Sequence, residues 1–362
     1  LELPAGTTYR TADHLALLPQ NPAELIARVQ RRFGTDLTEL VILHRHGRVP
    51  DHIPTERPIT LGEVFSRYVE LQSPATIEQI ETMIARCSCP PERTALQKLV
   101  DDADEFAARI TTARVSLLDL LESYRSVELG VDTFLAMLPA LAPRRYSVSS
   151  SPAAQPGHID LMVAAVDAPH LSGEGTYRGT ASTYVRQLQQ GDTVLGRVLP
   201  CSDDFRLEND QPAIVISAGT GLAPFRGVIQ DRAHSADAAP LLCYFGCDHP
   251  DVDFLHREEL EEAESNGVVD LRPTYFAAPE DNCAFVQDRI RKDAREVWRM
   301  IEEEQRHLRV CGDGARLVPG VNRALLDVYR TQSGNDDEDQ ALAWLEELTA
   351  SGRLVIDAWS SK

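Results

Sequence analysis

The segment Ala213-Ile214-Val215-Ile216-Ser217-Ala218-Gly219-Thr220-Gly221-Leu222-Ala223-Pro224-Phe225-Arg226 decides the fold of this chain. Its first five residues predict a buried strand, and Pro224 is well placed near the start of a helix. Between them, Gly219 and Gly221 allow a close approach of the backbone, and free N–H groups at the helix N-terminus suit a phosphate. Because Pro224 replaces the third glycine of the dinucleotide-binding pattern, a purely structural turn explains the segment equally well.

Strands alternate with helices over residues 208–362. The predicted pairs are Ala213–Ser217 with Pro224–Arg232, Leu241–Gly246 with Arg257–Ser265, Val268–Tyr275 with Phe285–Lys292, and Leu308–Cys311 with Leu317–Arg330. A helix at Gln340–Ala350 and a strand at Gly352–Ile356 follow. This alternation predicts a doubly wound parallel sheet with its ligand at the carboxyl ends of the strands.

Residues 1–207 are predicted as a small β-barrel that a helical insert interrupts at about 23–141. Within the insert, apolar residues recur at helical spacing, as in Leu61, Val64, Phe65 and Tyr68. Strands are expected on either side of it, and those after it are Arg145–Ser149, Ile159–Val166 and Asp192–Leu199. The fold class is therefore α+β and multidomain.

Composition narrows the range of partners. The 362 residues are 43% hydrophobic and 25% charged, as in ordinary soluble proteins, and no apolar run could cross a bilayer. Seven dispersed cysteines without a Cys-x-x-Cys pair predict a reducing cytoplasm and no metal site. A formal charge of −20 disfavours nucleic acid and favours a basic protein partner.

The strand Arg144-Arg145-Tyr146-Ser147-Val148-Ser149 alternates an aromatic ring, cations and hydroxyl groups between its two faces. Tyr146 can stack on a flat ring while Arg144, on the same face, reaches a diphosphate. The alternative is a half-exposed barrel strand with a packed tyrosine.

Small residues in Gly179-Thr180-Ala181-Ser182 precede a helix predicted at Thr183–Gln189. A helix start of this kind also suits a diphosphate, although an ordinary N-cap by Ser182 is the simpler account.

Two further segments lie at strand ends. Cys311-Gly312-Asp313 ends a predicted buried strand, where open α/β sheets place their chemistry, although a lone cysteine is usually a small hydrophobic residue. Trp359 follows the last predicted strand, so its flat ring can cover a flat cofactor or simply cap the edge of a core.

In this order the segments resemble the FAD and nicotinamide-nucleotide half of the diflavin reductases, the family of cytochrome P-450 reductase. The resemblance covers essentially the whole chain, and Tyr68–Gln72 with Cys89-Pro90-Pro91 looks most like bacterial reductases fused to a fatty-acid-hydroxylating monooxygenase. The segments that carry it are Arg144–Ser150, Gly179–Ser182, Gly219–Phe225, Tyr244-Phe245-Gly246-Cys247, Cys311–Asp313 and Asp357-x-Trp359.

The resemblance implies a role for each matched residue. Tyr146 and Trp359 are expected to cover the two flavin faces, and the nicotinamide must displace Trp359. Ser147, Cys311, Asp357 and Trp359 form the implied catalytic set. The remaining implied FAD residues are Arg144, Ser149, Gly179, Thr180, Ala181 and Ser182, and the implied NAD(P)H residues are Gly219, Thr220, Gly221, Pro224, Cys311, Gly312, Asp313, Phe276, Ala277, Phe285 and Gln287.

Several departures from the family bear on the coenzyme. NADPH-preferring members carry Ser-Arg and then Lys-x-Tyr-x-Gln, where this chain has Phe276-Ala277 and Cys283-x-Phe285-x-Gln287. Losing two cations removes charge-assisted bonds worth ~1.5–3 kcal/mol each, so NADH is expected to compete with or beat NADPH. The candidate substitute cations are Arg272, Arg289 and Arg291. Ala12 also stands where relatives have glycine, and Arg145 where they often have a second tyrosine.

The implied enzyme takes hydride from NADPH or NADH onto FAD. It passes single electrons to an FMN domain and then to a cytochrome P-450 haem monooxygenase, both expected in the same full-length polypeptide. The absent FMN domain and a first barrel strand that looks cut suggest a fragment. A sulfite-reductase or nitric-oxide-synthase type reductase half is an alternative, and a non-catalytic flavin-binding interaction module is an alternative of another class.

Overall fold

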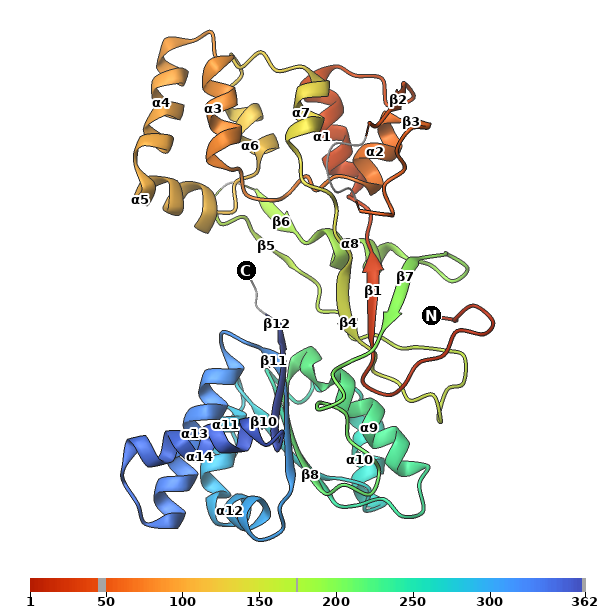
Figure 1. Cartoon of the computed structure of the whole chain (residues 1–362), viewed down its shortest axis with the longest axis vertical. Coiled ribbons are helices and arrows are strands. Elements are labelled where there is room, and N and C mark those ends of the chain that lie inside the picture. The colour runs from red at the N-terminus through yellow and green to blue at the C-terminus, as the bar shows by residue number, and fades with distance from the viewer. Residues whose placement is uncertain (45–49, 174, 360–362) are drawn as a thin grey trace. The chain divides into compact units, whose positions relative to one another are not determined.

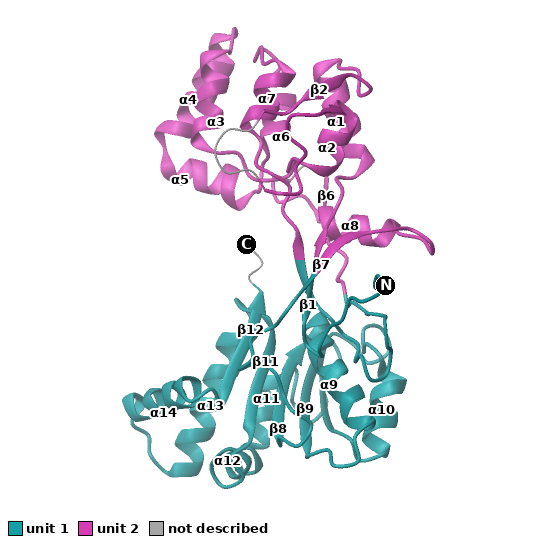
Figure 2. Cartoon of the chain, turned by 45° about the vertical axis from the view of Figure 1, so that its right-hand side comes forward, with its two compact units in different colours: residues 1–15, 145–162, 198–362 teal, residues 16–144, 163–197 magenta. Residues whose placement is uncertain are grey.

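The computed structural model describes residues 1–44, 50–173 and 175–359. The chain forms two compact units, shown in Figure 2. Unit 1 comprises residues 1–15, 145–162 and 198–362, and unit 2 comprises residues 16–144 and 163–197. The predicted division into residues 1–207 and 208–362 stays a prediction.

A five-stranded parallel sheet forms the centre of unit 1 (Figure 1), and its order is β10-β9-β8-β11-β12. The strands are β8 (Ala213–Ala218), β9 (Leu241–Cys247), β10 (Asp270–Tyr275), β11 (His307–Asp313) and β12 (Leu354–Trp359). This confirms the predicted parallel sheet. The last strand extends three residues beyond its predicted end, because it pairs in register with β11 as far as Asp313 and Trp359.

Helices cover both faces of this sheet, because its strands are apolar on both sides. Val215 of β8 packs into the core with Phe225 of α9, whereas its neighbour Ile216 packs into a second core with Ile290 of α11. The helices are α9 (Ala223–Ala233), α10 (Arg257–Ser265), α11 (Val286–Lys292), α12 (Ala294–Glu302), α13 (Leu317–Ser333) and α14 (Glu338–Ala350). The sequence did not predict α12, which Asp293 separates from α11.

A three-stranded sheet of order β4-β1-β7 precedes the parallel sheet in the chain. Its strands are β1 (His14–Leu18), β4 (Arg144–Ser147) and β7 (Leu195–Leu199). The chain passes from one unit to the other within each of these strands. Together with the parallel sheet, this confirms the predicted α+β class.

The predicted strand Ile159–Val166 is wrong. Leu161 forms only an isolated bridge with Val148. The backbone of Val166 bonds the start of α8 (Thr180–Gln187), accepting from the Gly179 amide at 2.9 Å and donating to Ser182 Oγ at 3.1 Å. The backbone N–H and C=O groups of Val166 therefore pair with the start of α8 and not with another strand. Apolar composition alone does not reveal this pairing.

Unit 2 contains the predicted helical block. Its helices are α1 (Ala23–Phe33), α2 (Leu61–Arg67), α3 (Ile77–Ala85), α4 (Pro90–Asp101), α5 (Ala103–Phe106), the π-helix η1 (Ala107–Thr112), α6 (Leu117–Ser123), α7 (Val131–Met137) and α8. Two-stranded sheets pair β2 (Leu40–Ile42) with β3 (Pro58–Thr60) and β5 (Asp167–Pro169) with β6 (Thr176–Arg178).

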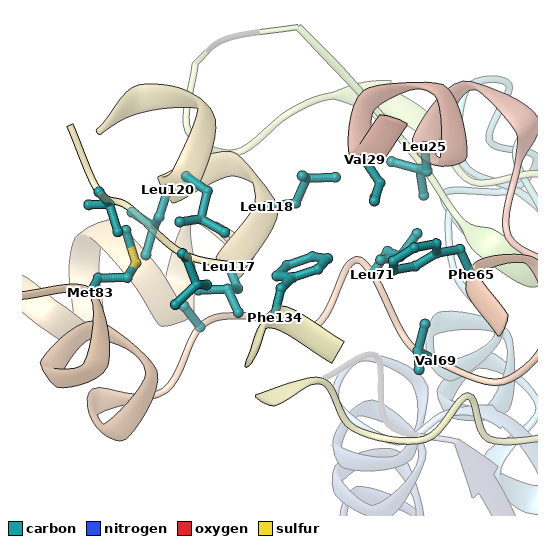
Figure 3. Packing of buried hydrophobic residues seen from close by; sticks show 14 of the residues in the cluster. Leu25, Val29, Phe65, Val69, Leu71, Met83, Leu117, Leu118, Leu120 and Phe134 are labelled. Carbon is teal, nitrogen blue, oxygen red and sulfur yellow. The ribbon is translucent and has the colours of Figure 1, made fainter. Parts of the chain in front are cut away.

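One apolar core holds the helices of unit 2 from α1 to α7 together (Figure 3). Phe65 of α2 and Phe134 of α7 are fully buried, with their ring centroids 6.2 Å apart. Burial of a side chain of this size contributes about 1.5–3 kcal/mol. No helix within the described ranges is long and apolar enough to cross a membrane.

Candidate functional site

The Gly219 loop follows β8 at the carboxyl end of the parallel sheet. Residues 219–222 form a 3₁₀ turn that leads directly into α9, with Pro224 in the first turn. Gly221 lies so close to β11 that a methyl group in its place would overlap the carbonyl oxygen of Cys311. The interpretation that Gly221 serves a phosphate is therefore incomplete, because packing against β11 already requires a glycine there.

Three of the predicted catalytic residues converge at this edge. Cys311 pairs in register with Asp357 of the neighbouring strand, and its thiol is hydrogen-bonded to the Ser147 hydroxyl. Burial raises the pKa of the Cys311 thiol, the Asp357 carboxylate raises it further, and the Ser147 hydrogen bond opposes both effects. Cys311 is therefore a neutral thiol at physiological pH.

His14 completes this cluster, although no sequence pattern indicated it. Its Nε2 lies 3.0 Å from Asp357 Oδ2, and the two residues are 343 positions apart in the chain. The His14 side chain is 14% exposed, so the hydrogen bond is largely shielded from solvent. His14 orients the carboxylate that faces Cys311.

Trp359 is the last residue of β12, and the residue is 43% exposed. The strand remains anchored here because the Trp359 carbonyl oxygen accepts from the Gly314 amide at 2.8 Å. Tyr146 lies in β4 and is partly buried. That these two rings sandwich a flavin stays a prediction.

Buried hydroxyl groups at the same edge have no protein partner within the described ranges. They belong to Ser149, Ser217 and Thr274, which are 0%, 0% and 2% exposed. Ser217 pairs in register with Cys311, and Thr274 lies beside Gly246 of β9. Buried polar groups are normally satisfied, so these hydroxyls suit a polar ligand.

The predicted diphosphate loop is the start of α8 in unit 2. The helix begins at Thr180, three residues earlier than predicted, and its N-cap is Gly179. The N-cap assignment of Ser182 is therefore wrong: its hydroxyl bonds the backbone of Val166 and Gly179 inside the first turn. A methyl group added at Gly179 would lie 3.0 Å from the Val166 side chain and press on it.

Arg144 is linked to this loop through a polar network within unit 2. Its guanidinium donates to the buried Glu70 carboxylate at 2.8 Å, and the same carboxylate accepts from the backbone N–H of Gln72 at 3.1 Å. The Gln72 side chain then donates to Thr180 Oγ1 at 2.8 Å. Glu70 and Gln72 lie in a segment that carried the family resemblance, but the sequence indicated no role for either.

A cavity of about 320 Å³ adjoins this network in unit 2. The Arg114 guanidinium carbon lies 5.6 Å from the centroid of the Tyr177 ring, a cation–π arrangement. Residues lining the cavity include Leu25, Gln72, Arg114, Ser116, Tyr177 and Arg178. The lining also includes Glu24 and Asp119, whose carboxylates pair with Arg178 at 2.9 Å and with Arg28 at 2.6 Å. The sequence did not predict this cavity.

All three proposed substitute cations are already paired with carboxylates. Arg272 contacts Asp270 at 2.7 Å, Arg289 contacts Asp293 at 2.9 Å, and Arg291 contacts Asp327 at 2.8 Å. The expectation that they replace the family's 2′-phosphate ligands is therefore unsupported. Gln287 packs on Gly320, where an added methyl group would lie 3.1 Å from its amide.

Comparisons with known proteins agree with this geometry. The family model for the FAD binding domain matches residues 3–184, and that for the oxidoreductase NAD-binding domain matches residues 215–322. These matches confirm the resemblance inferred from the sequence.

Similar proteins include "Bifunctional cytochrome P450/NADPH--P450 reductase 2" of Bacillus subtilis (strain 168), which is 37% identical over 366 residues and covers 99% of this chain. A bifunctional cytochrome P450/NADPH--P450 reductase of Bacillus cereus is 36% identical over 99% of the chain, and one of Fusarium oxysporum is 38% identical over 96%. The alignments cover 34%, 34% and 33% of these relatives, so the chain spans about a third of their length.

Proposed function

Because the chain belongs to the FAD binding domain family and continues into an oxidoreductase NAD-binding domain, we propose that it is a flavoprotein reductase that oxidises a reduced nicotinamide nucleotide. The observation that carries this proposal is the convergence of Ser147, Cys311 and Asp357 at the carboxyl edge of the parallel sheet. Open α/β sheets bind their ligands at this edge.

The described residues have complementary chemistry for hydride transfer. The Asp357 carboxylate, held by His14, can stabilise the positive charge that develops on a nicotinamide ring as hydride leaves. The neutral Cys311 thiol and the Ser147 hydroxyl position that ring without adding a competing charge. FAD, when bound, supplies a ring system that accepts two electrons together and releases them singly.

Trp359 is placed to regulate access in this proposal. The residue is 43% exposed at the end of β12, and its carbonyl oxygen accepts a hydrogen bond from Gly314. The side chain can therefore rotate while the strand stays anchored, and a nicotinamide can take its position.

We also propose that the electrons leave through an FMN domain to a cytochrome P450. The support is the similarity to proteins whose names join a cytochrome P450 to an NADPH--P450 reductase. The seven cysteines are all free thiols, which supports a reducing cytoplasm as the setting. Electron delivery to a separately purified FMN domain from such a relative would test the partner.

We propose NADH, in preference to NADPH, as the coenzyme. Phe276, Ala277, Cys283 and Phe285 replace the cationic and polar positions of NADPH-preferring relatives, and the nearby arginines are paired with carboxylates. Two missing charge-assisted bonds of ~1.5–3 kcal/mol each correspond to roughly tenfold or more in affinity apiece.

Steady-state turnover with ferricyanide as electron acceptor tests both the activity and the preference. We expect turnover with NADH at a kcat/KM equal to or above that for NADPH. A value for NADPH more than about a hundredfold higher would refute the preference but retain the reductase. FAD-loaded protein that turns over neither nucleotide would instead be a flavin-binding module without catalysis.

A further inference from the structure

The backbone that continues beyond β4 runs against one face of α9. The backbone N–H of Ser151 donates to the side-chain oxygen of Gln230 at 2.9 Å. A methyl group added at Gly227 would lie only 3.0 Å from the Ser150 carbonyl oxygen, so the helix backbone is in close contact with this segment. The Gly219 loop leads directly into the same helix. One rigid element therefore joins the candidate nucleotide loop to the end of β4.

Arg226 makes the central contact between α9 and this segment. Its Nη1 donates to the Ser149 carbonyl oxygen at 3.0 Å and to the Asp160 carboxylate at 3.0 Å. Its Nε donates to Glu259 of α10 at 2.9 Å. The Arg226 side chain is only 6% exposed, so these hydrogen bonds are shielded from water. Because the guanidinium is a rigid fork of donors, one side chain fixes all three groups together.

The backbone of Ser149 is consequently held on both sides. Its N–H donates to the Asp160 carbonyl oxygen at 2.8 Å, and its C=O accepts from Arg226. Ser147 lies two residues earlier in the same chain segment, and its hydroxyl is hydrogen-bonded to the Cys311 thiol. A fixed backbone at Ser149 therefore restricts where the Ser147 hydroxyl can lie.

Two carboxylates flank the Arg226 guanidinium, one from each of the segments that it joins. Asp160 lies beside Ser149, and Glu259 belongs to α10. Charge-assisted hydrogen bonds to these carboxylates orient the guanidinium. An apolar side chain at position 226 would remove the Arg226 donor from the Ser149 carbonyl oxygen, and it would leave the residues of the Gly219 loop as they are.

We propose that Arg226 is a positioning residue for hydride transfer, which holds the Ser149 carbonyl oxygen and thereby keeps the Ser147 hydroxyl beside Cys311. This inference rests on the proposed reductase function and adds to it a residue of α9, outside the polar cluster. Loss of Arg226 should slow hydride transfer from bound nucleotide without weakening nucleotide binding, because a displaced Ser147 no longer orients the nicotinamide.

Anaerobic rapid mixing of the FAD-loaded full chain with increasing NADH separates these effects, because it gives a limiting rate of flavin reduction and an apparent Kd for NADH. Arg226→Met should lower the limiting rate per bound FAD about five- to tenfold and change the apparent Kd by less than about twofold. Arg257→Met is the matched control, since it makes the same change at an exposed ion pair of α10. Its limiting rate should equal that of wild type.

A double-mutant cycle with Ser147→Ala tests whether Arg226 acts through Ser147. In the Ser147→Ala background, Arg226→Met should lower the limiting rate by less than about twofold, because the hydroxyl that Arg226 positions is absent. Equal fold losses in both backgrounds would assign Arg226 a purely structural role and overturn the inference.

Arg226→Lys keeps the charge but not the fork of donors, so its limiting rate should fall only about two- to threefold. This variant decides the test if Arg226→Met does not fold, and a wild-type limiting rate in Arg226→Lys would then overturn the inference. Wild-type flavin that NADH reduces, with no loss of rate in either Arg226 variant, would contradict this inference alone. Wild-type flavin that neither NADH nor NADPH reduces would contradict the proposed function and the inference together.

Discussion

Ala12 has a φ of 69° and is only 2% exposed, so a buried alanine occupies a left-handed position. Relatives with glycine here avoid a strain of roughly 1–2 kcal/mol. Glycine costs about 0.5–1 kcal/mol of backbone entropy, and removing a buried methyl group costs about 0.8 kcal/mol. These terms nearly cancel, which gives a physical reason why the chain retains alanine at this position.

Gly221 is far less tolerant, because its neighbour is rigid backbone. We expect Gly221→Ala to lower the free energy of unfolding by about 1–3 kcal/mol, since the added methyl group overlaps the Cys311 carbonyl oxygen. Urea unfolding curves measure this change. Gly246→Ala is the control, because its nearest neighbour is a side-chain atom of Val286 at 3.3 Å, and its loss should be smaller. Equal losses would contradict the close contact.

The sequence identified three residues of the polar cluster but missed the fourth, His14. Ser147, Cys311 and Asp357 were identified through the resemblance, and the register of β11 with β12 brings the last two together. His14 was missed because its partner is 343 residues away, and no local pattern reports such a contact.

Among the elements, β11 contains one buried cation near its start, Arg309. Arg309 is 3% exposed and donates to the carbonyl oxygens of Gly352 and Arg353, which fixes the start of β12. His307 lies two residues earlier, with its Nδ1 3.3 Å from Arg309 Nη2. Burial lowers the pKa of His307, and the charges of Arg309 and Arg353 lower it further.

This arrangement predicts a stability loss at mildly acidic pH. The pKa of His307 in the folded state lies below the unfolded value of about 6.5, so the unfolded state binds more protons at this residue. The stabilising contribution of His307 is therefore complete above about pH 6.5 and declines as the pH falls through the folded pKa. His307→Gln keeps an acceptor for Arg309 and does not titrate. The melting temperature of this variant should fall less than that of wild type between pH 7.5 and pH 5.5. Identical losses would contradict the assignment.

Element boundaries show where sequence patterns are insufficient. The strand–helix alternation predicted β8 to β12, and the inner strands β8 and β9 are apolar and buried on both faces. Residues 159–166 have a similar apolar texture, but their pairing is limited to an isolated bridge between Leu161 and Val148, and Val166 bonds the start of α8. Backbone pairing depends on tertiary neighbours, and periodicity does not contain that information.

In the molecule as a whole, the candidate site residues divide into two groups that lie in different units of the chain. The parallel sheet of unit 1 carries the Gly219 loop, the Cys311 cluster and the aromatic pair Phe276 and Phe285. Unit 2 carries Arg144, the α8 N-terminus and the cavity beside Gln72. The formal net charge is −20, and a basic partner surface stays a prediction.

The most direct test of the reductase assignment is anaerobic rapid mixing of FAD-loaded protein with NADH. The visible flavin absorbance should bleach in a single turnover. Cys311→Ala should retain FAD but bleach about tenfold or more slowly, because it removes the thiol that we propose positions the nicotinamide. Flavin absorbance that stays unchanged with both NADH and NADPH would contradict the account.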